Sequence, residues 1–200
     1  EVKKNDNINP QSESAKGLNG FISAADDKPY EFPEYKTADI PSLRRKHLND
    51  FTSFVREMLE IEAPLSEELL LQRIAFMFNY YGKVTPAVVR EYENRMRRAD
   101  KQGIIRRNGF LYLEGQEETP FRRLGKFKRE VKEVSLEELA SGMRTLLRLN
   151  VSVDREGLFR EIINQLGFNR LTEPVKQRLN AALKLLDGET QTDGSRITLK

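Results

Sequence analysis

The chain has 200 residues, with 34 Lys and Arg against 31 Asp and Glu, and its formal net charge is +3. It contains no cysteine, which excludes disulfides, thiolate zinc sites and thiol nucleophiles. No apolar run approaches the roughly eighteen residues that cross a bilayer, and no secretory signal peptide is visible, so we expect a cytoplasmic protein with no membrane partner. Because the first residue is Glu, we also expect a fragment of a longer protein.

The first forty residues differ in composition from the rest. Residues 1–28 are rich in Asn, Asp, Ser, Gly and Lys and show no period, which predicts disorder. The next stretch is expected to be extended, and its aromatic side chains Tyr30, Phe32 and Tyr35 could dock on a neighbouring surface. Residues 1–40 are therefore predicted to be a disordered or extended lead-in.

A helical pattern follows this lead-in. It begins near Ser42 and ends before Pro64, and we expect one helix there. Ser66 is a good N-cap for a second helix. Thr85 caps a third helix, which has a proline at its first position and runs to about Lys101.

The stretch GIIRRNGFLYL, residues 103–113, follows the third helix. Asn-Gly between short apolar runs is a strong signal for a β-hairpin, because both turn positions tolerate positive φ. Residues 41–116 should therefore form a helical unit that ends in a hairpin.

The same order of elements occurs a second time. Ser135 with Glu138 predicts a capping box at the start of a helix that runs to about Leu149. Asp154 and Thr172 are expected to cap two further helices.

The chain closes with ETQTDGSRITL, a second hairpin in which Asp193-Gly194 takes the place of Asn108-Gly109. We interpret residues 41–116 and 135–200 as an internal duplication. The predicted fold is mostly α with small β wings, formed by tandem winged helix-turn-helix repeats.

Residues 117–134 link the two repeats and are basic. Residues 119–134 hold six Lys and Arg against two Glu, with apolar residues interleaved. They could be a packed connector between the repeats, which we slightly favour, or a basic strap that follows a nucleic-acid backbone.

Positive charge is concentrated in the third helix and the first hairpin. Residues 83–107 hold eight Lys and Arg against three acidic residues, a balance of +5, whereas residues 51–82 hold two against five, a balance of −3. At about 100° per residue, Val88, Tyr92, Met96 and Ala99 gather on one side of the helix. The opposite side can enter the DNA major groove, where Arg suits guanine, Asn suits adenine and Lys holds phosphate. The predicted DNA-binding residues are Arg90, Asn94, Arg97, Arg98, Lys101, Arg106 and Arg107.

The second repeat offers fewer such residues and could instead contact a protein. Secondary contacts to DNA or to a partner are assigned to Arg122, Arg123, Lys126, Lys128, Arg170, Lys176 and Lys184. A serine-nucleophile elbow, a nucleotide phosphate loop and metal-ligand spacing are all missing from the sequence. We therefore expect no catalysis, no cofactor, no metal site and no small-molecule substrate.

Residues 166–183, LGFNRLTEPVKQRLNAAL, resemble a repeated pattern, L-G-F-x-R-x-x-x-x-[IV]-x-x-R-[LI]-x-x-A-[LI]. That pattern belongs to a C-terminal domain of unknown function in large bacterial superfamily I DNA helicase-like proteins. Residues 60–78, EIEAPLSEELLLQRIAFMF, are similar to the opening of the same pattern, with Gln72 in place of an Arg. The resemblance covers roughly residues 35–200. It implies a parent with a helicase core and often a restriction-endonuclease-like domain, and an accessory role for this module.

Three functions follow from these observations. The first is a non-catalytic accessory module that binds double-stranded DNA within a helicase or nuclease machine. The second is a protein-interaction module, which docks the helicase and nuclease domains of the parent chain to each other or binds another protein. The third is a stand-alone winged-helix regulator.

Overall fold

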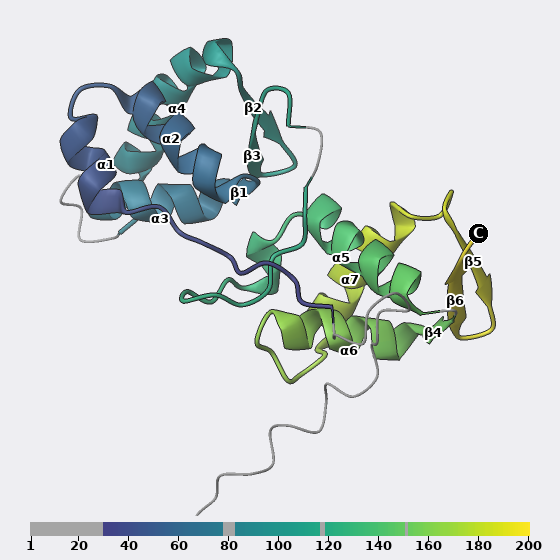
Figure 1. The fold of residues 1–200 in the computed structure, drawn as a ribbon. Coiled ribbons are helices and arrows are strands. Elements are labelled where there is room, and N and C mark those ends of the chain that lie inside the picture. The colour runs from purple at the N-terminus through teal and green to yellow at the C-terminus, as the bar shows by residue number, and fades with distance from the viewer. Residues whose placement is uncertain (1–29, 78–82, 117–118, 151) are drawn as a thin grey trace, which may run out of the picture.

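The computed structural model describes residues 30–77, 83–116, 119–150 and 152–200. Within these ranges the chain is mostly helical, with two small antiparallel sheets (Figure 1). The prediction of disorder for residues 1–28 lies outside them. Unit 1 comprises α1 (Ile40–Lys46), α2 (Phe51–Glu62), β1 (Leu65–Ser66), α3 (Glu67–Met77), α4 (Pro86–Ala99), the 3-10 helix η1 (Asp100–Gln102), β2 (Ile104–Arg107) and β3 (Phe110–Leu113).

A short 3-10 helix, η2 (Val131–Glu133), precedes the second unit. Unit 2 comprises α5 (Leu136–Leu149), β4 (Val153–Asp154), α6 (Arg155–Gln165), α7 (Glu173–Lys184), β5 (Thr190–Asp193) and β6 (Arg196–Leu199). From α2 in unit 1 and from α5 in unit 2, the order is helix, strand, helix, helix, hairpin. The two units therefore share one order of elements among the described residues, as the internal duplication predicted.

Each sheet has a short strand that the sequence did not predict. The strand after the first long helix pairs with the last strand of the hairpin, so the strand orders are β1-β3-β2 and β4-β6-β5. Leu65 pairs with Leu111, and Val153 pairs with Ile197. Two residues are too few to show a period, so only the tertiary pairing defines these strands.

Hairpin 1, formed by β2 and β3, has the predicted turn. Arg107 pairs with Phe110, and between them Asn108 and Gly109 have φ of 52° and 76°. Positive φ at both central residues is the geometry that continues the right-handed twist of the two strands. The Gly109 carbonyl also accepts a hydrogen bond from the Glu67 amide at 3.0 Å, which fixes the turn against the start of α3.

Hairpin 2, formed by β5 and β6, turns one residue later than predicted. Asp193 pairs with Arg196, so Gly194 and Ser195 are the two turn residues. Gly194 has φ of 59°, the left-handed value that glycine adopts without steric cost. Matching Asp193-Gly194 to the first turn was therefore wrong by one position, because Asp193 belongs to the ladder.

The predicted N-cap residues stand directly before their helices, but they do not all cap in the same way. Thr85 accepts a hydrogen bond from the Val88 amide at 3.3 Å, and Asp154 accepts from two amides at the start of α6. Ser135 accepts from the Glu138 amide at 3.1 Å, whereas Thr172 makes no side-chain capping bond. The capping box at Ser135 is only half formed, because the Glu138 carboxylate is bound by two arginines instead.

The prediction of a single helix from Ser42 to Pro64 is wrong, because this stretch forms two helices, α1 and α2. α1 ends at Lys46, and α2 begins at Phe51. Asp50 starts the second helix by accepting a hydrogen bond from the Ser53 amide at 3.0 Å. An aspartate at this position satisfies an amide that would otherwise lack a partner, and it therefore favours a new helix start over a continuous helix.

Each unit has its own hydrophobic core. In unit 1 the buried faces of α2, α3 and α4 meet the sheet, and Val88, Tyr92, Met96 and Ala99 are at most 2% exposed. In unit 2 the helices α5, α6 and α7 pack together, and Phe32 from the lead-in is part of this second core. The face of α4 predicted from periodicity is therefore the face that the core of unit 1 buries.

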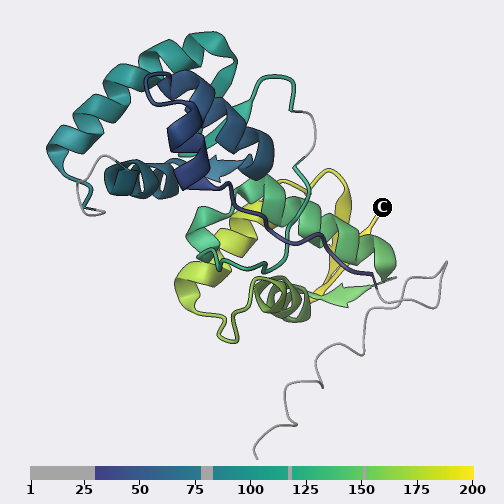
Figure 2. The ribbon, with the colours of Figure 1, turned by 60° about the vertical axis from the view of Figure 1, so that its left-hand side comes forward.

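The strap, residues 30–39, and the connector, residues 119–134, join the two units. The strap is extended and runs across unit 2 before it enters α1 of unit 1 (Figure 2). Tyr35 and Arg123 are hydrogen bonded through their backbones at 2.9 Å, and the Phe32 ring lies 4.7 Å from the Phe121 ring. Of the aromatic residues that were predicted to dock, Phe32 packs into unit 2, the Tyr35 hydroxyl donates a hydrogen bond to Glu62 of unit 1, and Tyr30 stays 45% exposed.

Candidate nucleic-acid interface

One face of α4 carries polar and basic side chains that the core does not use. Its buried residues repeat every three or four positions, so the residues between them face solvent. The exposed residues on this side are Arg90, Asn94, Arg97 and Arg98 of α4, with Lys101 on the 3-10 helix η1 that follows it. None of the five has a side-chain hydrogen bond or an ion pair with another residue in the described part of the chain. The structure therefore brings together five of the seven predicted DNA-binding residues, with free side chains.

A polar groove adjoins this face. It has a volume of about 490 Å³ and lies between the first turn of α2 and α4. Asn94 and Arg98 line it from α4, and Asn49 and Thr52 line it from the other side. The groove gives the α4 face a concave margin with hydrogen-bonding groups on both walls.

Arg106 is paired within the protein, unlike the five residues on the α4 face. Its guanidinium donates two hydrogen bonds to Glu93, at 2.9 and 2.8 Å, and one to Glu67 at 2.6 Å. The hydrogen bonds from Arg106 lower the pKa of Glu93, whereas burial and the neighbouring Glu67 raise the pKa of Tyr92. Arg106 therefore anchors hairpin 1 to α3 and α4, and carboxylates already accept from three of its N–H donors.

Arg107, its neighbour, points away from this cluster and remains about half exposed, at 54%. Its guanidinium lies 4.5 Å from the centre of the Tyr112 ring and 3.3 Å from Glu137 on α5. Tyr112 donates a hydrogen bond to the same Glu137 at 2.9 Å. Arg107 is accessible, and it also lies where hairpin 1 meets unit 2.

The basic residues of the connector are mostly engaged within the protein. Arg122 is buried between the units, and Arg123 donates to the Phe32 carbonyl at 3.0 Å and to Glu31 at 2.6 Å. Lys128 donates to the Gly167 carbonyl and lies 3.9 Å from the Phe168 ring. These contacts agree with the packed-connector alternative, and of the predicted connector cations only Lys126 lacks a hydrogen bond or ion pair to a described residue.

Unit 2 presents fewer basic groups on its third helix, α7, and in the loop before it. Arg170 and Lys184 are exposed, Lys176 is half-buried, and none of them has an ion pair within the described ranges. Arg178 is different, because it donates to the Val131 and Val134 carbonyls and holds α7 against the connector. Burial lowers its pKa.

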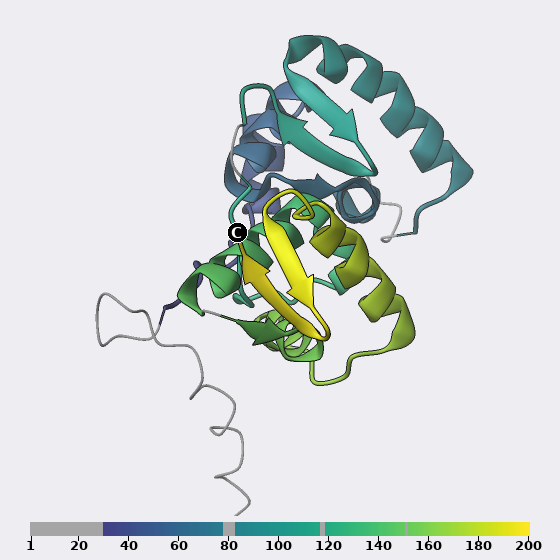
Figure 3. The same cartoon turned by 90° about the vertical axis from the view of Figure 1, so that its right-hand side faces the viewer.

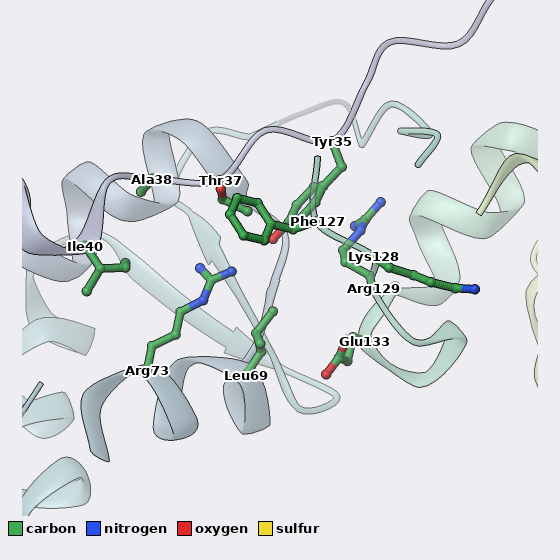
Figure 4. Close-up of a pocket in the computed structure, with 10 residues that line it drawn as sticks. All are labelled: Tyr35, Thr37, Ala38, Ile40, Leu69, Arg73, Phe127, Lys128, Arg129 and Glu133. Carbon is green, nitrogen blue, oxygen red and sulfur yellow. The ribbon is translucent and has the colours of Figure 1, made fainter. Parts of the chain in front are cut away.

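A second hollow lies where the strap, α3 and the connector meet, with a volume of about 300 Å³. Figure 4 shows the Phe127 ring beside Thr37, with the Arg73 guanidinium pointing in the direction of this ring. Phe127 is 52% exposed, an unusual position for an aromatic side chain. Sequence periodicity could not have located this hollow, because its walls come from three separate segments.

Other kinds of site are not evident in the described ranges. No group of three or more His, Cys, Asp or Glu side chains there could hold a metal ion. None of the helices there is long and apolar enough to cross a bilayer. Comparisons with protein-family models, with curated proteins and with solved structures find no match for this chain.

Proposed function

We propose that this chain is a non-catalytic module of two winged helix-turn-helix units that binds double-stranded DNA, with α4 as the principal recognition helix. The order of helix, strand, helix, helix and hairpin in each unit supports the winged-helix assignment. In that arrangement the third helix can enter the major groove while the hairpin reaches the flanking backbone.

The observation that carries the proposal is the contrast between α4 and the other basic segments. Arg90, Arg97, Arg98 and Lys101 are exposed and unpaired among described residues, whereas the guanidinium groups of Arg106 and Arg122 have carboxylate partners. Glu93 stands three residues after Arg90 and four before Arg97, the spacing of helical ion pairs, but its two carboxylate oxygens accept hydrogen bonds from Arg106 instead. On α4 the basic face keeps its charge available for an anionic partner.

The direct test is fluorescence anisotropy of labelled duplex DNA at several salt concentrations. If about four phosphates are neutralised, the logarithm of the binding constant should fall with the logarithm of salt with a slope near −4. Arg97→Glu should weaken binding and flatten this slope. Arg44→Glu is the matched control, because Arg44 is an exposed cation on α1 of the same unit.

Two results contradict the proposal. One is no detectable binding at ~50 mM salt, where phosphate contacts are strongest. The other is binding that Arg97→Glu changes no more than Arg44→Glu. The proposed parent, a helicase or nuclease machine of bacterial type, rests on the sequence resemblance alone.

A protein-docking role is the second candidate function. The exposed Phe127 beside the hollow of about 300 Å³ favours it, because exposed aromatic rings beside a cavity are typical anchors at protein interfaces. Capture of the parent's helicase or nuclease domain by the wild-type chain, lost with Phe127→Ala and without DNA binding, would support this role over the first.

A further inference from the structure

We infer that unit 2 extends the DNA-binding surface of unit 1, so that one duplex is bound across α4, hairpin 1 and α7. This inference rests on the proposed function. It adds a second contact region, in which Lys184 is the principal cation, and a minimum length of DNA.

The first support is the placement of the two third helices. α4 and α7 lie on the same side of the molecule, at the right in Figure 3, and the strap lies on the opposite side. Hairpin 1 connects the two helices in space. Arg106 on β2 is hydrogen bonded to Glu93 of α4, and the Arg178 guanidinium of α7 lies 5.7 Å from the centre of the Phe110 ring on β3. A duplex bound to α4 can therefore extend along hairpin 1 and reach α7.

The second support is the equivalence of positions on the two helices. Thr85 and Thr172 are the N-cap residues of α4 and α7, so positions 87 apart correspond. Lys184 then corresponds to Arg97 and is exposed without an ion pair among the described residues, and Gln177 corresponds to Arg90. Unit 2 thus keeps one cation and one amide on the face where unit 1 has its free arginines. Such a face holds phosphates more readily than it identifies bases.

The third support is the fixed connection between the units. Arg122 of the connector donates to the Glu62 and Pro64 carbonyls of unit 1 and to Glu138 of unit 2, all within 3.2 Å. Because these groups are buried, the second contact region is already oriented when the first one binds. A preoriented second region adds affinity without the entropy of ordering a flexible link.

The expected length of DNA follows from groove geometry. Two recognition helices that enter the same face of a duplex are about one helical turn, roughly 10 base pairs, apart. A duplex of ~10 base pairs can contact unit 1 alone, whereas ~20 base pairs should contact both units. A longer duplex offers more positions at which the protein can bind, which alone raises the apparent affinity. The rise between ~10 and ~20 base pairs should exceed this statistical effect, and the affinity should level off by ~30 base pairs.

The experiment measures anisotropy with duplexes of ~10, 20 and 30 base pairs for four proteins. These are the wild type, Arg97→Glu, Lys184→Glu and Arg148→Glu. Arg148 is an exposed cation on the last turn of α5, a helix end that lies on the side opposite α7 in Figure 3. The three substituted side chains are exposed. The circular dichroism spectrum and the urea unfolding midpoint of each variant should therefore match those of the wild type.

Lys184→Glu should bind the short duplex like the wild type. It should bind the two longer duplexes several-fold more weakly, with a salt slope reduced by about 1. The inference is overturned if Lys184→Glu behaves like Arg148→Glu at every length, or if affinity does not depend on length. In that case a loss with Arg97→Glu still supports the proposed function, so the two failures can be told apart.

Discussion

Arg122 and Glu138 form a buried ion pair at the junction of the two units, with Nη2 of Arg122 2.7 Å from Oε2 of Glu138. The Glu138 side chain is fully buried, and Arg129 donates to its two oxygens at 2.9 and 2.6 Å. The same Arg122 guanidinium also reaches the Glu62 carbonyl of unit 1. One carboxylate on α5 thus holds the connector, and through Arg122 it holds unit 1 in place.

We predict that Glu138→Gln lowers the free energy of unfolding by about 3–5 kcal/mol. The amide keeps the shape of the side chain but leaves two buried guanidinium groups without their anion, which is the costly way to break a buried pair. Urea unfolding followed by circular dichroism measures this loss. Glu60→Gln, on an exposed position of α2, should stay within about 0.5 kcal/mol of the wild type. Equal effects of the two substitutions would contradict the importance of the buried pair.

The same carboxylate should make stability depend on pH in acid. Burial alone would raise the pKa of Glu138, but hydrogen bonds and charge from Arg129 and Arg122 outweigh burial and lower this pKa. Because the folded pKa lies below the unfolded value of about 4.3, the contribution is present above pH ~4.3 and is lost as pH falls towards the folded pKa. Unfolding midpoints measured between pH ~5 and 2 should fall more steeply for the wild type than for Glu138→Gln. Parallel curves for the two proteins would contradict this.

We predict that Gly125→Ala detaches or strains the strap. A Cβ at position 125 would lie 2.1 Å from the Tyr35 carbonyl oxygen, a backbone atom that cannot rotate away. The expected loss is about 1–3 kcal/mol, as for other overpacked sites, and trypsin should cleave faster after the exposed Lys36 in the strap. Gly188→Ala is the control, because a Cβ there meets no atom within 4 Å. Unchanged cleavage and stability in Gly125→Ala would show that the strap is not held at this point.

Local chemistry explains which parts of the fold were predictable from sequence. The buried stripe of α4, the caps at Thr85 and Asp154 and the Asn-Gly turn each depend on residues close together in the chain. Periodicity and capping preferences describe such features directly. The same information placed the five free polar residues of α4 and η1 on the exposed side.

The features that the sequence did not predict depend on distant partners. β1 exists because Leu65 meets Leu111, and the strap is ordered because Tyr35 meets Arg123. Arginine is a residue type that commonly contacts DNA, and only the fold shows that Arg106 is bound by Glu67 and Glu93. No local pattern carries this information, because the partners lie 13 to 88 positions away.

The adjacent arginines of hairpin 1 should separate stability from binding. Arg106→Gln removes three hydrogen bonds to carboxylates and should lower the free energy of unfolding by about 1–2 kcal/mol, a modest value because the cluster is partly exposed. Arg107→Gln removes one longer, exposed pair and should stay within about 1 kcal/mol of the wild type. On DNA the order should reverse. Arg107→Gln should flatten the salt slope by about 1, and Arg106→Gln, measured where it is fully folded, should leave the slope unchanged.

Urea unfolding and salt-dependent anisotropy on the same two proteins measure both quantities. The stability difference depends on contacts within the protein, those of Arg106 with Glu67 and Glu93 against that of Arg107 with Glu137, so it tests the structure even if the chain binds no DNA. A larger loss of stability with Arg107→Gln than with Arg106→Gln would contradict the ion-pair cluster. A flattened slope with Arg106→Gln would instead mean that DNA displaces the two carboxylates and that Arg106 contacts a phosphate.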